Sequence, residues 1–177
     1  KRCGHDPRNG EHPGRNVRIG VVSDTHNNLR NVSAIVSLFN AAGVDQVVHT
    51  GDITQAKTLE VFARLDAPLC GVFGNNDLEV EALGAAIDKY GFRFVQPPLE
   101  LVWADRRIVV VHDPLEFDQV RLSDFDLALH GHTHRETIEF EPTHLRFNPG
   151  ECAGMMKGFN AVGIVGLISL APEVLRF

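Results

Sequence analysis

The amino-acid sequence predicts an α/β protein, a four-layer α/β/β/α sandwich in which two mixed β-sheets are flanked by helices. In the first half of the chain, short β-branched runs alternate with segments whose apolar residues recur at helical spacing. This alternation is typical of a parallel sheet covered by helices. In the second half, strand-like runs follow one another with little helical periodicity, which predicts a second sheet packed on the first.

The first half contains three units of strand, loop and helix. The first strand is expected over 17–22, where the β-branched run stops at polar Ser23 and Asp24. The apolar positions from Leu29 to Phe39 then recur at helical spacing, and Gly43 gives a stop signal. By the same reasoning, strands are expected at 47–48 and 69–73, and helices over 59–65 and 83–90. Functional groups at the carboxyl ends of such strands lie where open α/β sheets place ligands.

The second half contains short runs with strand character. They lie at 92–95, 99–103, 108–111, 127–129, 137–140 and 145–147. The uncharged run 161–171 holds 11 residues, whereas a membrane-spanning helix needs about 20. We therefore expect 161–170 to be a buried strand in the core of the sandwich, and we expect no membrane association.

Length and composition predict one globular domain over 17–177. The chain has 177 residues, 44% of them hydrophobic and 23% charged, which suits one sizeable core. Residues 1–16 are rich in Gly, Pro, Arg, Asn and His without an apolar run, so a flexible tail is expected there. Cys3, His5 and His12 are irregularly spaced in that segment, and a solvated tail is the better interpretation than a metal site.

Charge and cysteine content restrict the classes of partner and the compartment. The net charge is −6, and the longest run of consecutive basic residues is the pair Arg106 and Arg107, so a nucleic-acid polymer is not an expected partner. The three cysteines are widely spaced, which indicates neither a disulfide framework nor a zinc knuckle. A cytoplasmic location is expected. The sequence leaves the oligomeric state open, with a homodimer as one possibility.

Five short motifs, each just after an apolar run, carry side chains that suit a divalent metal ion. In chain order they are Asp24-Thr25-His26, Gly51-Asp52, Gly74-Asn75-Asn76-Asp77, His112 and Gly131-His132-Thr133-His134. Each motif alone has an ordinary structural interpretation, such as a polar strand end, a solvated turn or a loop histidine. The hypothesis of a metal site depends on the ordered set.

Local geometry supports this hypothesis. Asp24 and His26 are two residues apart, so on an extended segment their side chains point the same way, and His132 and His134 share this relation. A carboxylate such as that of Asp52 has two oxygens and can bridge two ions about 4 Å apart. Neutral Asn and His ligands let a site hold two cations without excess ligand charge.

This ordered set resembles the calcineurin-like metallophosphoesterase family, whose motifs run Asp-x-His, Gly-Asp, Gly-Asn-His-Asp or Glu, His, and Gly-His-x-His. The resemblance covers 19–150, and the segment 148–152 with the absence of inserted lids is similar to the small YfcE-like and archaeal phosphodiesterase subgroup. It implies a specific set of ligands: Asp24, His26 and His134 on one metal, Asn75, His112 and His132 on the other, and Asp52 bridging both.

One position departs from the family pattern. Asn76 stands where the broader family has a histidine, and an amide is not a proton donor of useful acidity. We therefore assign no catalytic acid, and expect good leaving groups such as aryl esters to be favoured. Asp77 is expected either to orient neighbouring groups or to cap a helix beginning near Leu78. His49 and His130 are expected either to hydrogen-bond the ligand network or to be buried histidines satisfied by backbone.

The function implied is a metal-dependent phosphodiesterase in which a hydroxide bridging two divalent ions attacks a small phosphodiester. The mixed nitrogen and oxygen ligands suit Mn²⁺, Ni²⁺, Fe, Co²⁺ or Zn²⁺. Two alternatives stay open. One is a non-catalytic, protein-binding scaffold like Vps29, which predicts degraded ligands, although all seven positions here keep the expected residue type. The other is nucleotide pyrophosphatase or phosphomonoesterase activity at the same site.

Overall fold

The computed structural model describes residues 16–177. The expected tail, with Cys3, His5 and His12, therefore lies outside the described residues, except for Asn16. The Asn16 side chain accepts a hydrogen bond from the backbone N–H of Ile168 at 3.1 Å.

The first sheet has six strands in the order β11-β10-β1-β2-β3-β4. Its strands β1 (Arg18–Val22), β2 (Gln46–His49), β3 (Leu69–Val72) and β4 (Arg93–Val95) pair in parallel. Two antiparallel strands, β10 (Ala161–Gly166) and β11 (Ala171–Arg176), extend the sheet beyond β1.

The run expected as one buried strand over 161–170 differs from the structure at its end. The six residues of β10 are all buried, but the strand ends at Gly166 and a turn follows. The sequence analysis missed β11, because this half-exposed strand at the edge of the sheet contains Pro172 and Glu173 and lacks an apolar run. Proline is tolerated in a strand at such an edge.

The second sheet has five strands in the order β5-β6-β7-β9-β8. The central strands β6 (Arg106–Val110), β7 (Leu127–Leu129) and β9 (Leu145–Asn148) are parallel. The outer strands β5 (Leu99–Trp103) and β8 (Thr137–Phe140) are antiparallel to their neighbours. Both sheets are therefore mixed, as predicted.

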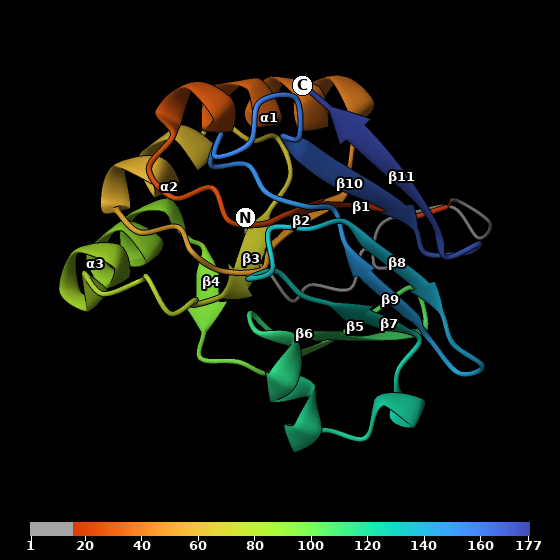
Figure 1. Ribbon diagram of the computed structural model, residues 1–177. Helices are drawn as coiled ribbons and strands as arrows, with labels where there is room; N and C mark the ends of the chain where they lie inside the picture. Colours follow the sequence, from red (N-terminus) through yellow and green to blue (C-terminus); the bar gives the residue numbers. More distant parts are fainter. Residues whose placement is uncertain (1–15) are drawn as a thin grey trace.

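Helices flank the two sheets, which confirms the predicted fold class. The helices α1 (Leu29–Ala42), α2 (Ala56–Phe62) and α3 (Val80–Tyr90) cover one side of the first sheet (Figure 1). The outer layer on the second sheet is thin and consists of two short 3-10 helices, η2 (Pro114–Gln119) and η3 (Leu122–Asp124). Among residues 16–177, no helix has the length and apolar character that crossing a bilayer would require.

Three apolar layers hold the sandwich together. Phe39, Phe62 and Leu83 lie in the layer between the helices and the first sheet. Trp103 and Phe147 lie in the layer between the two sheets. A small cluster that includes Phe117 and Phe125 joins the second sheet to the 3-10 helices. Full burial of one large apolar side chain stabilises the fold by about 1.5–3 kcal/mol. The three packed layers therefore fix the strands from which the loops of the site start.

Candidate metal centre

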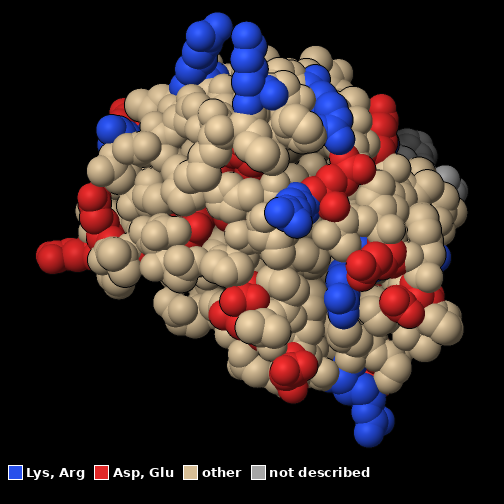
Figure 2. Space-filling model, in the orientation of Figure 1, with Lys and Arg blue, Asp and Glu red and all other residues tan. Residues whose placement is uncertain are grey.

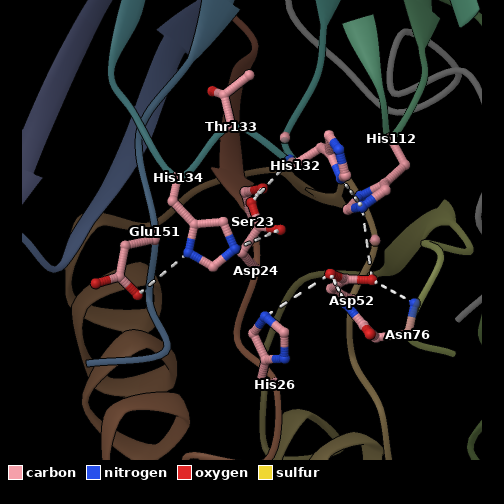
Figure 3. Close-up of polar contacts among 12 residues, drawn as sticks. Ser23, Asp24, His26, Asp52, Asn76, His112, His132, Thr133, His134 and Glu151 are labelled. Carbon is pink, nitrogen blue, oxygen red and sulfur yellow. Dashed lines mark hydrogen bonds and ion pairs between the residues drawn. The ribbon is translucent and has the colours of Figure 1, made fainter. Parts of the chain in front are cut away.

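Loops at the carboxyl ends of strands from both sheets bring the five motifs together. Asp24 and His26 follow β1, Asp52 follows β2, and Asn75 follows β3 in the first sheet. The second sheet contributes further histidines after its own parallel strands, namely His112 after β6 and His132 and His134 after β7. Figure 3 shows the drawn side chains of these motifs converging on Asp24 and Asp52.

The first group of candidate ligands is Asp24, His26, Asp52 and His134. One ligand atom from each lies within 4.8 Å of the others. His26 Nε2 is 3.7 Å from Asp52 Oδ2, and His134 Nε2 is 3.6 Å from Asp24 Oδ1. These spacings exceed hydrogen-bond length, and they leave room for an ion between the groups.

Two buried atoms of this group lack a hydrogen-bond partner within residues 16–177. Asp24 Oδ1 and His26 Nε2 are buried and have no hydrogen-bond partner among the described residues. A buried polar group without a partner costs about 1–3 kcal/mol. A divalent cation would satisfy both atoms, so the donor set fits a metal ion.

The second group consists of Asn75, His112 and His132. Asn75 Oδ1 lies 2.9 Å from His112 Nε2 and 3.1 Å from His132 Nδ1, and the two histidine nitrogens are 3.3 Å apart. His112 Nε2 also lies 3.5 Å from Asp52 Oδ1. The two oxygens of Asp52 thus face different groups, Oδ2 the first and Oδ1 the second.

The ring of His112 is held in the tautomer that a metal ligand needs. Its Nδ1 lies 2.8 Å from the carbonyl oxygen of Thr50. Since a carbonyl only accepts, Nδ1 carries a proton, and in the neutral ring the lone pair of Nε2 points into the second group. Asp113, the next residue, caps η2 with its side chain, and its Oδ2 lies 3.6 Å from His132 Nε2.

The two aspartates have opposite pKa shifts. Burial raises the pKa of the Asp24 carboxyl, and the hydrogen bond from the Ser23 hydroxyl offsets only part of this effect. Burial acts the same way on Asp52, but two hydrogen bonds from Asn76 and the nearby histidines outweigh it and lower the pKa of Asp52. Asp52 is therefore stabilised as an anion by the protein itself, whereas Asp24 would gain most from a cation.

The backbone at the ligands adopts the left-handed region. Asp24, His26, Asp52, His132 and His134 have φ between 45° and 67°, and they are five of the nine non-glycine residues with positive φ in the described chain. Such a conformation costs on the order of 1–3 kcal/mol per residue and persists only where the surroundings enforce it. The ligand loops thus store strain at the ligand positions.

Two glycines of the motifs are required by space. At Gly131, a Cβ atom would collide with Ser23 Oγ and lie 2.6 Å from Thr50 Oγ1. Gly51 has φ of 107°, and a Cβ there would lie 2.6 Å from His112 Nδ1. Only glycine lets these loops approach the ligands so closely.

Asp77 orients the loops rather than capping a helix. Its Oδ2 accepts hydrogen bonds from the backbone N–H groups of Asp52 at 3.0 Å and Gly74 at 2.7 Å, and its Oδ1 accepts one from Thr54 at 2.6 Å. The helix expected near Leu78 is α3, which begins at Val80 with Glu79 as its N-cap. The capping interpretation was therefore wrong.

His49 ties the first two ligand loops together. Its Nδ1 accepts a hydrogen bond from the backbone N–H of Gly51 at 3.0 Å, so Nε2 carries the proton and donates to Thr25 Oγ1 at 2.9 Å. Burial lowers the pKa of His49 to about 3, and the ring is neutral. His130 is also buried, its pKa is lowered by burial, and its Nδ1 lies 3.1 Å from the carbonyl oxygen of Gly131.

Sequence analysis missed Glu151 and Asn148 as supports of the site. Glu151 is fully buried, and its Oε2 lies 4.0 Å from His134 Nδ1. The amide of Asn148 donates to the carbonyl oxygen of Gly131 at 3.3 Å and to Thr133 Oγ1 at 3.2 Å, which holds the loop of the last motif. The available signal was their position at the end of β9, another parallel strand, because Asn148 is its last residue and Glu151 follows it.

The sequence matches one family model and one well-characterised class of relatives. Residues 17–168 match the calcineurin-like phosphoesterase superfamily domain. The chain is 29% identical over 154 residues to the phosphodiesterase MJ0936 of Methanocaldococcus jannaschii, an alignment that covers 84% of this chain and 92% of that protein.

Solved structures share the architecture. An archaeal phosphodiesterase superposes with a TM-score of 0.83 and 26% identity, over 90% of this chain and 99% of that one. The phosphoesterase YfcE of E. coli has a TM-score of 0.67 and 19% identity, over 89% and 98% of the two chains. Vps29 of Entamoeba histolytica has a TM-score of 0.63 and 15% identity, over 90% and 98%. The last two likenesses establish the fold alone.

Proposed function

Because the chain belongs to the calcineurin-like phosphoesterase superfamily, we propose that it is a metal-dependent phosphodiesterase acting on small phosphodiesters. Its similarity to a phosphodiesterase of Methanocaldococcus jannaschii supports the choice of diesters. The observation that carries the proposal is the position of Asp52, whose two oxygens face two separate groups of candidate ligands.

Each group suits one divalent ion. Asp24, His26 and His134 would hold the first ion, Asn75, His112 and His132 the second, and Asp52 would be shared. Mn²⁺, Ni²⁺, Fe, Co²⁺ and Zn²⁺ all accept such mixed nitrogen and oxygen ligands. When bound, a pair of divalent ions lowers the pKa of water and withdraws negative charge from the phosphoryl oxygens.

The charges of the ligands favour a singly anionic substrate. Only Asp24 and Asp52 of the seven ligands are acidic, so two divalent ions would leave a centre of about +2. A phosphodiester carries one negative charge at neutral pH. On the face drawn in Figure 2, some Lys and Arg side chains project side by side at the top, and the others are interspersed with acidic and uncharged residues. This distribution favours a small substrate over a polymer.

Asn76 determines which leaving groups are favoured. Its backbone N–H donates to Asp52 Oδ1 at 2.9 Å, and its side-chain Nδ2 donates to Asp52 Oδ2 at 2.8 Å. An amide cannot protonate a departing alkoxide, and general acid catalysis is worth typically about 10²–10⁴-fold. The proposed enzyme therefore favours esters whose leaving oxygen is stable as an anion, such as aryl esters.

The scaffold alternative is disfavoured by the buried polar atoms of the site. A protein-binding scaffold has no use for Asp24 Oδ1 and His26 Nε2 held buried without partners in the described structure, because each lowers stability. A pyrophosphatase or phosphomonoesterase would use the same ligands, so substrate choice must be measured.

Removal and return of metal tests the proposal. The protein is treated with a chelator, dialysed, and assayed with bis(p-nitrophenyl) phosphate beside p-nitrophenyl phosphate, before and after adding Mn²⁺ or Ni²⁺. We expect turnover to be lost with the metal and restored by it, with the diester preferred. If added metal restores no turnover, the proposal that the protein is an enzyme is refuted. If the monoester is preferred, the assignment as a diesterase is refuted.

A further inference from the structure

A hollow of about 310 Å³ adjoins the candidate ligand His134. It lies between the loop after β7 and the segment 151–160 that precedes β10, and its walls include Arg135, Met156, Phe159 and Arg176. A second hollow of similar size shares His134, Arg135 and Met156 with it and adds Met155. Because the two hollows share these three lining residues, they are neighbours beside His134, and together they are called the groove.

The groove is lined by apolar side chains that the fold does not bury. Met155, Met156 and Phe159 are 64%, 45% and 53% exposed, and all three come from one short segment. Exposed apolar groups gathered beside convergent polar groups are typical of a ligand site. Each of the two hollows has a volume at the low end for such sites, so one hollow suits a single small ring system.

The types of side chain select a planar aromatic group. Methionine sulfur makes favourable contacts with aromatic rings, and guanidinium groups stack on their faces. Arg176 packs over the Phe159 ring at 5.8 Å from its centroid and pairs with Glu136 at 2.7 Å. Its guanidinium is thereby fixed as part of the wall. Arg135, one residue after the ligand His134, also faces the groove.

Glu151 fixes the distance between the groove and the metal centre. Its Oε1 accepts a hydrogen bond from the backbone N–H of Met156 at 3.0 Å, and its Oε2 accepts one from Gly154 at 3.1 Å. The same Oε2 lies 4.0 Å from His134 Nδ1. One buried carboxylate therefore links the segment that forms the groove to a candidate ligand, so a group seated there lies next to a bound phosphate.

The groove lies on the side of the centre away from Asn76. In Figure 3, His134 and Glu151 lie on one side of Asp52 and Asn76 on the other. The leaving group is expected near Asn76, which stands where the broader family has its proton donor. The other ester substituent then points toward His134.

We propose that this groove binds a planar aromatic substituent of the phosphodiester, the one that stays on the phosphate after hydrolysis. The proposal rests on the diesterase function above. In the reaction, a water oxygen bonds to phosphorus and the water releases a proton to solvent. The P–O bond to the leaving group breaks with its electron pair on the departing oxygen, which leaves as an anion. The P–O bond of the aromatic substituent stays intact, and the product is its phosphomonoester.

The experiment uses diesters that share the p-nitrophenyl leaving group and differ in the retained group, which is methyl, phenyl or a 5′-nucleoside. The variants are Phe159→Ala and Met156→Ala, and Phe140→Ala is the matched control because Phe140 is an exposed phenylalanine outside the groove. We expect wild type and control to prefer the aromatic esters by kcat/KM. In the groove variants, the ratio of kcat/KM for an aromatic ester to kcat/KM for the methyl ester should fall about threefold to tenfold. The fall comes from the aromatic ester, because the methyl group does not reach the altered side chains.

The outcomes separate the possibilities. A larger loss with the nucleoside ester identifies a nucleobase as the aromatic group, and a larger loss with the phenyl ester identifies a simple aryl group. Equal losses with all three esters, including methyl, overturn the proposal, because the groove then binds the leaving group. An unchanged preference in both variants also overturns it.

A binding measurement keeps this test separate from the diesterase activity. Phenyl phosphate and methyl phosphate are titrated into the metal-loaded protein by calorimetry, with the same variants. Tighter binding of phenyl phosphate that is lost in Phe159→Ala supports the groove even if no diester is turned over. Equal binding of the two phosphates in wild type counts against it.

Discussion

Asn76 holds both carboxylate oxygens of Asp52, with its backbone N–H donating to Oδ1 at 2.9 Å and its side-chain Nδ2 donating to Oδ2 at 2.8 Å. The residue in the position of the family's proton donor therefore serves the candidate bridging ligand. These hydrogen bonds help to lower the pKa of Asp52. With Asn76 in place of the family's histidine, a side chain that could protonate a leaving group is replaced by one that orients Asp52 and stabilises it as an anion.

Asn76→His should change the dependence of rate on the leaving group. An imidazolium near the departing oxygen would assist poor leaving groups, so the rate ratio of an alkyl to a p-nitrophenyl ester should rise about tenfold or more. Rates for a series of esters with leaving groups of increasing pKa measure this effect. Asn76→Ala is the control, because it removes the amide without adding an acid, and an equal rise in that variant would contradict the assignment.

Asp52→Asn should lower the occupancy of both metals. A neutral amide offers one ligand oxygen instead of two and removes a negative charge shared between the ions, so activity should fall by about a hundredfold or more. Metal content per chain, measured by plasma mass spectrometry after equilibration with Mn²⁺, checks this. Asp24→Asn is the matched variant and should empty mainly one position. Loss of only one metal in Asp52→Asn would rule out its bridging role.

Gly131→Ala should disrupt the centre through its backbone. The added Cβ would collide with Ser23 Oγ and lie 2.9 Å from Asp24 Oδ2, so the loop carrying His132 and His134 must move. We expect destabilisation by about 1–3 kcal/mol and loss of metal binding. Gly84→Ala in α3 is the control, since its Cβ meets nothing within 4 Å. Urea unfolding and metal titration measure the two effects.

Glu151→Gln should weaken metal binding and loosen the groove together. The amide would place a donor against the N–H groups of Gly154 or Met156, which both need an acceptor. We expect about 10–100-fold weaker affinity for one metal, with a smaller preference for aromatic esters. The exposed Glu173→Gln serves as control. Unchanged metal affinity with a lost ester preference would limit Glu151 to shaping the groove.

Metal addition should raise the melting temperature. The orphaned atoms Asp24 Oδ1 and His26 Nε2 and the strained ligand loops lower the stability of the metal-free protein. Binding at a hundred times Kd adds about 2.7 kcal/mol, which corresponds to a rise of about 5–11 °C for a domain of this size. Calorimetry with and without Mn²⁺ measures the rise in melting temperature. The rise should be smaller in Asp52→Asn.

The sequence predicted most of the fold because each buried strand is an apolar run and most runs end at a turn signal. It missed β11, whose residues alternate between partly buried and exposed positions around Pro172. The thin layer of η2 and η3 also lacks helical periodicity. The formation of β11, η2 and η3 depends on the sheet edge or sheet face that each of them covers. The local order of apolar and polar residues does not reveal that edge or face.

The candidate ligands followed from motif order, whereas the roles of Asp77 and His49 stayed open and those of Glu151 and Asn148 were missed. Asp77 resembles a helix cap in sequence, yet it accepts hydrogen bonds from Asp52, Thr54 and Gly74. Glu151 Oε2 lies 4.0 Å from Nδ1 of His134, which belongs to a segment far from Glu151 in the chain. Their roles depend on which backbone N–H groups and rings meet them in space, and residue spacing carries no such information.

Directed evolution of this protein toward higher stability is limited by the left-handed backbone at five candidate ligands, Asp24, His26, Asp52, His132 and His134. Glycine relieves the cost of positive φ, so a selection for heat resistance without metal would enrich glycine at these positions. Each such gain would delete a ligand. Thermostable variants that keep the centre must instead gain their stability elsewhere, or be selected in the presence of the ion.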